Sequence, residues 1–522
     1  MRLESYLGGE WKAGNGEARP LVNPVTGAKI AEADSSGLDL QAALDHARVA
    51  GGAALRNITF AERGALLKSV ADVLAANRDK YEQIARENSG NTKVDAAIDI
   101  DGGIGTLKYY ARLGGGLGET HSLVEAGEDQ LAREPVFGAR HYWNSRPGVA
   151  VQVNAFNFPS WGMWEKIAAA TVAGVPSLAK PATSTAMLSF EMMRDVIAAN
   201  VVPDGVFNFI CGSGEGLLDA AGPMDSIAFT GSAATGFSVR SHANVLRSGV
   251  RVNVEADSIN GMIVGPDVGP GSPLFDLAVR ETVKALSVKA GQLCTNIRRI
   301  FVPRSISTQF CDAVAESAKK LSVGDPADEA IRVGPLVNRR QQETALEGIG
   351  KLSAEARVLF GGGIPEGLPA AIRQGGAFVA PTLLLCDSPQ EGKAVHETEV
   401  FGPCSTVMPY EEIGGAIDLA TFGGGSLALS LFTGDGQVES KAVRHLGPWH
   451  GRIMIVDETV GRNHTGHAIV MPQCVHGGPG RAGGGEELGG LRGLRLHMQR
   501  TAVQTSPQAH ATLASRTSET AL

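Results

Sequence analysis

Between residues 148 and 230 the sequence alternates short apolar runs with longer amphipathic ones, and this alternation constrains the fold more than any other feature. Apolar runs at 149–153, 175–179 and 226–229 are separated by helical patterns at 164–173 and 186–199. Strands that alternate with helices in this way are typical of right-handed βαβ units around a parallel sheet. We therefore predict an α/β fold whose ligand site lies at the carboxyl ends of the strands.

The same alternation of apolar and amphipathic runs recurs after residue 260, and in a chain of 522 residues it predicts a second α/β domain. The N-terminal part contributes helical patterns at 38–54, 61–88 and 99–113, and we expect the glycines of 114–120 to end the last of these. The second domain is expected to contain helices at 274–290, 308–321 and 339–352 and strands at 299–302 and 380–385.

Charge and cysteine content exclude several classes of function. A net charge of −8 argues against nucleic acid or an anionic membrane as the main partner, because either would require a basic surface. Six scattered cysteines without a CxxC pair favour a reducing compartment, so we expect a cytoplasmic protein. No apolar run approaches the roughly 18 residues of a membrane span, and the start of the chain does not resemble a signal peptide.

The stretch Gly291-Gln292-Leu293-Cys294-Thr295 places a cysteine directly after a polar turn, with Arg298 and Arg299 shortly after it. A thiolate is a strong covalent nucleophile, and a flexible glycine lets backbone N–H groups approach an oxyanion. Taken alone, the cysteine is more often a buried structural residue. Its interpretation therefore depends on the rest of the chain.

Four other segments place polar groups where predicted strands end: Asn157 before Phe-Pro, Lys180 before Pro-Ala, the turn 229–236 and Glu255. An amide can donate to an oxyanion, a lysine and a glycine turn can reach a phosphate, and a carboxylate can act as a base. Each also has an ordinary explanation, as a turn residue or a solvated charge. The glycines of 212–216 resemble a dinucleotide fingerprint, but the helix after them is too short, and we do not assign them this role.

Together, and in this order, these segments resemble the aldehyde dehydrogenase superfamily. The matching elements are Asn157-Phe158-Pro159, Lys180-Pro181-Ala182, the turn at Phe229 to Ser232, Glu255, the Gly-Gln-x-Cys-Thr element at Cys294, and Glu399-Val400-Phe401-Gly402-Pro403. The resemblance implies a Rossmann-like cofactor domain with a parallel sheet, an α/β catalytic domain and a small β element for oligomerisation.

The resemblance implies domain limits as well. We expect the cofactor domain at 1–121 and 147–254 and the catalytic domain at 255–470. The hairpin at 122–146 and the segment 486–504 are similar to the subunit-bridging elements of the superfamily, so a homodimer or a dimer of dimers is expected. We expect the polar tail at 505–522 to be disordered, since it lacks an apolar face.

The mechanism that the resemblance implies begins with attack of the Cys294 thiolate on an aldehyde. Asn157 and the Cys294 N–H hold the oxyanion, hydride passes to a nicotinamide, and Glu255 activates the water that hydrolyses the thioester. Lys166 and Glu487 resemble a pair that carries protons to and from Glu255, with Glu165 as a further candidate. An ordinary ion pair explains the pair equally well.

Cofactor binding is implied for a set of residues around these elements, and the cofactor is expected to be NADP. Many NAD-preferring relatives have glutamate directly after Lys-Pro-Ala, where this chain has Thr183. Without that carboxylate, Thr183 and Lys180 can accept a 2′-phosphate. The expected cofactor residues are Phe156, Lys180, Ala182, Thr183, Gly231, Ser232, Glu255, Ala256, Glu399 and Phe401.

The C-terminal part departs from the common pattern of the superfamily, in which a Pro-Phe-Gly-Gly element is usual. Its segments 461–467 and 476–485, with 423–426, resemble a narrower group that oxidises coenzyme A-linked semialdehydes in aerobic aromatic degradation. One branch acts on 3,4-dehydroadipyl-coenzyme A semialdehyde in benzoate degradation, and the other is part of a bifunctional phenylacetate ring-opening enzyme with a hydratase. The polar tail leads us to expect the benzoate branch.

Three alternatives remain open. The substrate could be the phenylacetate-pathway semialdehyde or a simple medium-chain aldehyde, and an inactive structural homologue is a further candidate. His464, His467, His476 and Cys474 could form a metal site, but a loop at the substrate entrance explains them equally well. We predict no metal, because the superfamily requires none.

Overall fold

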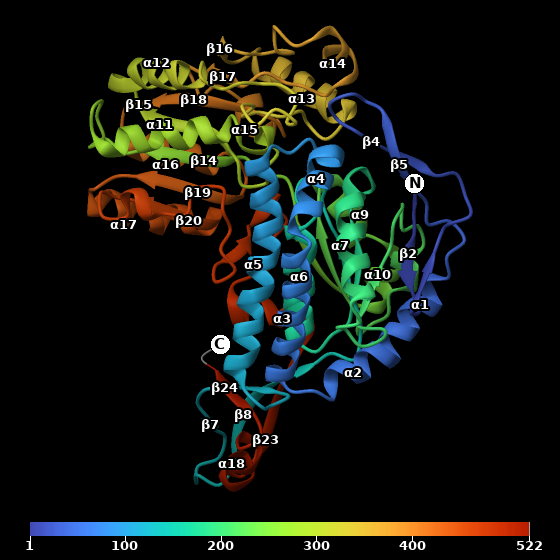
Figure 1. The fold of residues 1–522 in the computed structure, drawn as a ribbon. Coiled ribbons are helices and arrows are strands. Elements are labelled where there is room, and N and C mark those ends of the chain that lie inside the picture. The colour runs from blue at the N-terminus through green and yellow to red at the C-terminus, as the bar shows by residue number, and fades with distance from the viewer. Residues whose placement is uncertain (521–522) are drawn as a thin grey trace.

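The computed structural model describes residues 1–520 and contains two seven-stranded sheets, each covered by helices, with a smaller sheet that projects below them (Figure 1). The predicted α/β class is therefore confirmed. The two helix-covered sheets lie next to each other (Figure 1).

The first sheet has the strand order β13-β12-β9-β10-β11-β2-β3. Its first five strands run parallel, and Thr230 at the end of β12 lies in register with Glu255 at the end of β13. The predicted βαβ pattern is confirmed, and several polar residues reach the same sheet edge. The strands are β2 (Ser5–Leu7), β3 (Glu10–Lys12), β9 (Ala150–Val153), β10 (Ser177–Lys180), β11 (Phe207–Phe209), β12 (Ser226–Thr230) and β13 (Arg251–Glu255).

The helix expected to end before Gly114 is instead a single long helix, α5 (Lys93–Leu117). The glycines serve close helix packing and do not interrupt the helix. A Cβ on Gly114 would lie 2.6 Å from the Phe60 carbonyl oxygen, and one on Gly64 would lie 2.5 Å from that of Ala111. Around this sheet lie α1 (Leu40–His46), α2 (Gly52–Arg56), α3 (Phe60–Ala76), α4 (Arg78–Ser89), α6 (Trp161–Val172), α7 (Ala186–Ala198), α8 (Leu217–Ala220), α9 (Ala233–Arg240) and α10 (Ala243–Ser248).

The second sheet has the order β16-β17-β18-β15-β14-β19-β20, parallel except for β16. The chain passes between the sheets in the short segment that joins β13 to β14, whereas the domain limits expected from the sequence stay predictions. The elements here are β14 (Asn260–Val264), α11 (Pro273–Ala285), β15 (Ile297–Pro303), α12 (Ser307–Ala318), α13 (Arg339–Leu352), β16 (Arg357–Phe360), α14 (Ala370–Gly375), β17 (Thr382–Leu385), α15 (Ala394–Glu397), β18 (Cys404–Tyr410), α16 (Ile413–Thr421), β19 (Ser426–Phe432), α17 (Gly436–Leu446) and β20 (His450–Val456).

The projecting sheet corrects the expectation of a disordered tail at 505–522. Residues 507–514 form a helix capped by Ser506, and the last described residues form a strand that pairs with β6. His510 is buried and stacks on Tyr142, so nonlocal contacts order a segment whose composition has no apolar face. Residues 521–522 lie outside the described part. The elements are β6 (Leu123–Glu125), β7 (Asp129–Gln130), β8 (Gly138–Ser145), β23 (Met498–Thr505), α18 (Pro507–Ala514) and β24 (Ser518–Thr520).

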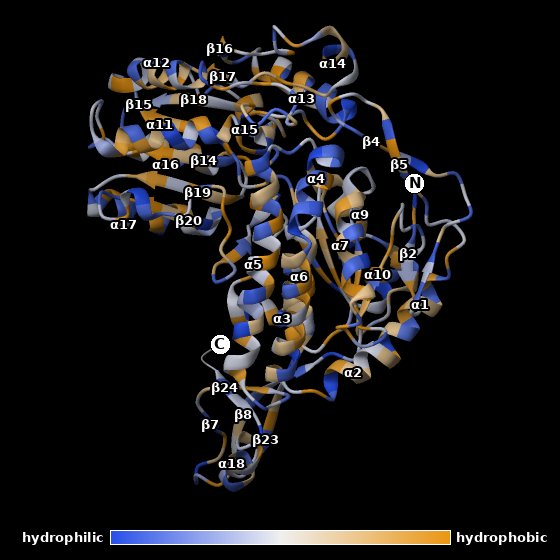
Figure 2. Cartoon of the chain, viewed as in Figure 1, coloured by the Kyte–Doolittle hydropathy of each residue, from blue (hydrophilic) through white to orange (hydrophobic). Residues whose placement is uncertain are grey.

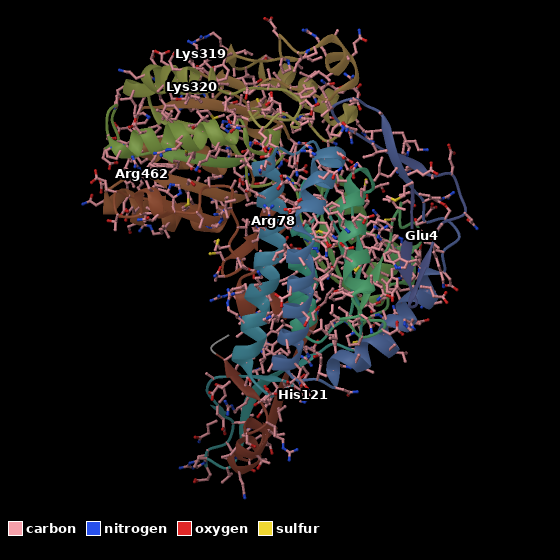
Figure 3. All side chains as sticks on the ribbon, viewed as in Figure 1. Glu4, Arg78, His121, Lys319, Lys320 and Arg462 are labelled. Carbon is pink, nitrogen blue, oxygen red and sulfur yellow. The ribbon has the colours of Figure 1, made fainter. Side chains whose placement is uncertain are left out.

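Apolar residues concentrate in the strands and on the inner helix faces, whereas the outer faces are polar (Figure 2). Charged side chains such as Lys319, Lys320 and Arg462 extend from the outer surface of the second domain (Figure 3). Among the described residues, no helix combines the length and the apolar character that crossing a membrane requires.

Candidate active site

Cys294 follows a strained turn that links the two domains. The helix predicted for 274–290 ends at Ala285, and Lys289 and Ala290 both have a φ of 49°. The Lys289 N–H donates to Asp95 Oδ1 at 2.8 Å, so α5 anchors the turn. Left-handed backbone at residues other than glycine persists only where the surroundings hold it, and such strain concentrates at functional sites.

Two buried side chains hold the backbone around Cys294 in place. Arg298 donates to the carbonyl oxygens of Gly291 at 3.0 Å and Gly402 at 2.7 Å. Asn260 Nδ2 donates to the Cys294 carbonyl oxygen at 2.8 Å. Arg298 therefore ties the turn before Cys294 to the segment 399–403, and its guanidinium does not face the substrate.

The tight approach of this turn makes Gly291→Ala a direct test of its geometry. Gly291 has a φ of +69°, and a Cβ there would lie 2.1 Å from the Gly402 carbonyl oxygen. We expect the variant to lose roughly 1–3 kcal/mol of stability and most of its activity, since the overlap is with backbone. Thermal unfolding and steady-state kinetics measure both effects.

Gly350→Ala is the matched control for this substitution. Gly350 lies in α13, and a Cβ there would have no neighbour within 4 Å. Because alanine favours a helix more than glycine does, the control should gain about 0.5–1 kcal/mol. A Gly291→Ala enzyme as stable and active as the parent would contradict the tight packing of the turn.

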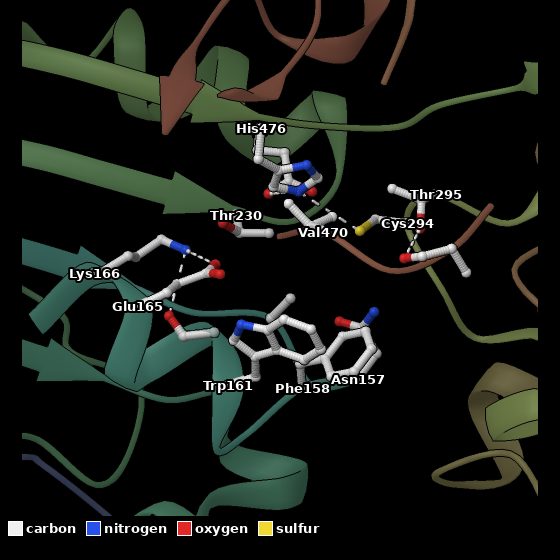
Figure 4. A pocket seen from close by; sticks show the side chains of 14 residues that line it. Asn157, Phe158, Trp161, Glu165, Lys166, Thr230, Cys294, Thr295, Val470 and His476 are labelled. Carbon is white, nitrogen blue, oxygen red and sulfur yellow. Dashed lines mark hydrogen bonds and ion pairs between the residues drawn. The ribbon is translucent and has the colours of Figure 1, made fainter. Parts of the chain in front are cut away.

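Cys294 opens onto a pocket with about 520 Å³ of space (Figure 4). Its walls are largely apolar, with polar groups at a few positions, as is typical of small-molecule sites. Cys294 and His476 lie on one side and Asn157 faces them from the other, while Lys166 and Glu165 lie at the far end. Further lining residues include Phe158, Trp161, Thr230, Glu255, Thr295, Ala468 and Val470.

Asn157 is buried in the loop that follows β9, and it contacts the turn that carries Cys294. Its Nδ2 donates to the Gln292 carbonyl oxygen at 3.0 Å. The contact aims the carboxamide donor at the backbone next to Cys294, where an oxygen on a sulfur-bound carbon would lie. The structure thus brings together Asn157 and Cys294, which are far apart in the sequence.

Glu255, at the end of β13, is buried beside the same thiol. Burial raises the pKa of Glu255, but the charge and hydrogen bond of His476, together with Lys166, outweigh it, and the net pKa is lowered. Burial and the Glu255 charge raise the pKa of the Cys294 thiol to about 11, although His476 opposes this shift. Glu255 is therefore held as a carboxylate, and the thiol needs help to ionise.

Lys166, in α6, lies close to Glu487, the partner that the sequence predicts for it. Its Nζ lies 3.1 Å from Glu487 Oε2 and 3.5 Å from Glu165 Oε1. Burial raises the pKa of Glu165 to about 7, whereas the two carboxylates raise the pKa of Lys166 despite its burial. Asn253 donates to Glu487 at 3.1 Å. The pair is formed at the end of the pocket, and its role as a proton path stays a prediction.

The residues predicted to hold the adenosine end of a dinucleotide gather at the edge of the first sheet. Lys180 Nζ donates to the Pro181 carbonyl oxygen at 3.2 Å, and Thr183, which follows Ala182, donates to that of Gly212 at 3.1 Å. Gly212 belongs to the glycine segment 212–216, for which we predict no cofactor role from the sequence. In the structure this segment lies beside the residues predicted to hold the adenosine end.

The turn at Gly231 and Ser232 leads into the N-terminus of α9. The Gly231 N–H donates to the Glu255 carbonyl oxygen at 3.1 Å, and Ser232 caps the helix. A helix N-terminus reached through a glycine turn offers N–H groups and a positive dipole end to phosphate. The turn is thus placed between Glu255 and the outer edge of the sheet.

The nicotinamide end of the predicted site shows an unpaired acceptor. Glu399 is half-buried, and its buried Oε1 has no hydrogen-bond partner among the described residues. Burial raises the pKa of Glu399 to about 7. Phe401 packs edge-on against Phe156 at 5.6 Å, and the Ala256 N–H donates to Ala482. A buried carboxylate oxygen without a partner fits the ribose hydroxyls of a dinucleotide.

Sequence reasoning missed His476, Arg298 and Asn260 as parts of the site. His476 was interpreted as part of an entrance loop and a weak metal candidate, but it contacts Glu255 and Cys294, whereas Cys474 is exposed. The four residues of the candidate metal site do not come together, since His467 hydrogen-bonds to Ser430. The one signal in the sequence that could have indicated His476 is its position shortly before Glu487, which is itself a predicted site residue.

Comparisons with known proteins agree with this geometry. A family model described as "Aldehyde dehydrogenase family" matches residues 11–501. A 3,4-dehydroadipyl-CoA semialdehyde dehydrogenase of Aromatoleum evansii is 47% identical over 482 residues, which cover 92% of this chain and 93% of that protein.

Solved structures share the fold. A betaine aldehyde dehydrogenase variant of Staphylococcus aureus in complex with NAD+ has a TM-score of 0.82 at 24% identity, covering 96% of this chain and 97% of that one. An NADP dependent enzyme of E. coli has a TM-score of 0.84 at 23% identity, covering 97% and 98%. The chain therefore belongs to the aldehyde dehydrogenase family, whose members oxidise aldehydes with NAD or NADP.

Proposed function

We propose that this protein oxidises a coenzyme A-linked semialdehyde, 3,4-dehydroadipyl-coenzyme A semialdehyde, to the free acid with NADP. The observation that carries the reaction type is the convergence of Cys294, Asn157 and Glu255 on one pocket. The substrate proposal rests on the 47% identity to a semialdehyde dehydrogenase along nearly the whole chain. The site retains all three groups, which argues against an inactive homologue.

In the proposed reaction Cys294 attacks the aldehyde carbon, and the oxygen takes the negative charge. Asn157 Nδ2 turns from the Gln292 carbonyl to this oxyanion and shares it with the Cys294 N–H. Glu399 and Phe401 would hold the ribose of a nicotinamide cofactor, which when bound would supply the hydride acceptor. The thioester left on Cys294 is hydrolysed by a water that Glu255 deprotonates, and Lys166 with Glu487 carries that proton away from the pocket.

NADP is favoured over NAD by the charges around Thr183. No carboxylate follows Lys180-Pro181-Ala182, and Lys180 and Arg19 are close enough for each charge to influence the other. Burial chiefly lowers the pKa of Lys180, and Arg19 adds to this shift, so a dianionic 2′-phosphate here would meet two cations.

Thr183→Glu is expected to reverse the preference. The added carboxylate would repel a 2′-phosphate and accept hydrogen bonds from the ribose of NAD. We expect kcat/KM for NADP to fall roughly 10- to 100-fold, about 1.4–2.8 kcal/mol, with little loss for NAD. Kinetics with both cofactors measure the change.

Thr344→Glu, on the exposed face of α13, adds the same charge away from the site and should change neither value. A parent enzyme that turns over NAD faster than NADP at equal concentration would refute the cofactor proposal. So would a Thr183→Glu enzyme with the parent's preference.

The substrate proposal is tested by comparing the coenzyme A semialdehyde with hexanal and benzaldehyde. We expect kcat/KM for the coenzyme A substrate to be higher by roughly 100-fold, about 2.7 kcal/mol, because the coenzyme A part adds binding energy. The phenylacetate-pathway semialdehyde is the closest competitor and belongs in the same series. Equal or better turnover of hexanal would favour a general medium-chain aldehyde dehydrogenase.

We further propose that the protein works in the cytoplasm as a dimer or a dimer of dimers. The projecting sheet exposes the apolar side chains of Leu131, Val136 and Phe137. Apolar side chains at the tip of a protruding element are common at subunit interfaces. The sequence segments 122–146 and 498–505, which form most of this sheet, largely coincide with the subunit-bridging elements expected from the sequence.

A further inference from the structure

His476 contacts both reacting side chains of the pocket, yet the reaction proposed above gives it no role. It lies in β21 (Val475–Gly477), opposite Glu487 of β22 (Glu486–Leu488). Its Nε2 is 3.0 Å from Glu255 Oε2 and 3.9 Å from Cys294 Sγ, and the side chain is 6% exposed. One imidazole nitrogen thus stands within hydrogen-bond reach of the carboxylate and of the nucleophile.

We propose that His476 is a catalytic residue, whose imidazolium exchanges its hydrogen bond between the Glu255 carboxylate and the Cys294 thiolate as the thiol proton moves to Glu255. This inference rests on the proposed role of Cys294 as the nucleophile.

The charges balance at each stage. In the resting site the imidazolium donates to the Glu255 carboxylate, and Cys294 is a thiol. On activation the Sγ–H bond breaks, its proton passes to Glu255, and the Nε2–H turns to the new thiolate. The imidazolium keeps one anionic neighbour throughout, so no uncompensated charge is buried at any step. The sulfur lone pair then forms the bond to the aldehyde carbon.

The surroundings support an imidazolium here. Burial lowers the pKa of His476, but the Glu255 charge and the hydrogen bonds to Glu255 and Cys294 outweigh it and raise the pKa well above its usual value. Without this cation, Glu255 would raise the pKa of Cys294 further, because two anions would face each other. The other charged groups facing this cluster are Lys166 and Glu165 of α6, Glu487 of β22, and Arg452 of β20.

Replacement by phenylalanine keeps the ring and removes both the charge and the donor, whereas glutamine keeps a donor without the charge. Alkylation of Cys294 by iodoacetamide, without cofactor and from about pH 5 to 10, reports thiolate formation directly. Peptide mass spectrometry separates Cys294 from the exposed Cys474. EDTA is present throughout, since the three groups could also bind a trace metal ion.

In both variants we expect iodoacetamide to alkylate Cys294 at least roughly tenfold more slowly at pH 7. The inflection in the plot of alkylation rate against pH should lie about one pH unit or more higher than in the parent. The KM for the aldehyde should change little while kcat falls. His445→Phe, on the exposed surface of α17, should match the parent.

Parent-like profiles in both variants would overturn the inference, and so would a parent-like profile in His476→Gln alone, because the charge would then be dispensable. If His476→Phe fails to fold, the glutamine variant decides. Alkylation does not depend on turnover, so the two proposals fail separately. An active Cys294→Ala enzyme would contradict the proposed reaction. An inactive Cys294→Ala enzyme, together with parent-like alkylation of Cys294 in the His476 variants, would contradict only the role of His476.

Discussion

Cys294→Ala is expected to abolish aldehyde oxidation, lowering kcat/KM by roughly 10⁴-fold or more. The reaction depends on a covalent bond to Sγ, and no other described thiol reaches the pocket. Asn157 and the backbone N–H would still be present, but without a sulfur-bound carbon no oxyanion forms for them to hold. The measurement is the rate of NADPH formation with a saturating aldehyde.

Two cysteines provide the controls for this prediction. Cys474→Ala removes the exposed thiol, and Cys311→Ala removes a buried one in α12. Both variants should retain parent activity within a few fold, although the buried site will lose some stability. A Cys294→Ala enzyme within tenfold of the parent would contradict covalent catalysis at this residue.

Glu255→Gln is expected to separate the two halves of the reaction. Glutamine has the same shape but cannot accept a proton, so hydrolysis of the thioester should slow roughly 10²- to 10⁴-fold. Removing the Glu255 charge also lowers the pKa of the Cys294 thiol, since that charge contributes to raising it. Acylation should therefore continue, with the thiol proton that Glu255 accepts in the parent passing to solvent instead, and most clearly at neutral pH where the parent thiol is largely protonated.

The signature of this variant is a burst. Stopped-flow absorbance should show close to one NADPH per active site, followed by slow steady-state turnover. Asp257→Asn, two residues away and facing α9, is the matched control and should turn over without a burst of this kind. A Glu255→Gln enzyme that lacks a burst but is slow from the start would place the damage in acylation.

The sequence predicted the parts of the fold that depend on local pattern. Short apolar runs between amphipathic helices correctly predicted the parallel strands β9, β10 and β12, because alternation of this kind leaves few topologies. The same logic failed at Gly114, where glycines that normally interrupt helices allow α3 and α5 to approach closely. Helix contacts of this kind are absent from a local pattern.

The candidate site was predictable where it depends on strand ends and less so where it depends on long-range pairing. Asn157 and Glu255 follow strands of one sheet, and their convergence follows from its parallel order. His476 lies in a strand of three residues that pairs with β22, and so short a strand has no periodicity to detect. The tail was mispredicted for the same reason, since its order comes from pairing with β6.

The central claim is that the substrate becomes a thioester on Cys294, and the mass of the protein tests it most directly. Glu255→Gln enzyme is mixed with NADP and the semialdehyde, quenched in acid after the burst, and analysed intact and as peptides. We predict one acyl group per chain, on the peptide that contains Cys294. NADPH formation with an unmodified Cys294 peptide, or with the acyl group on another cysteine, would contradict the account.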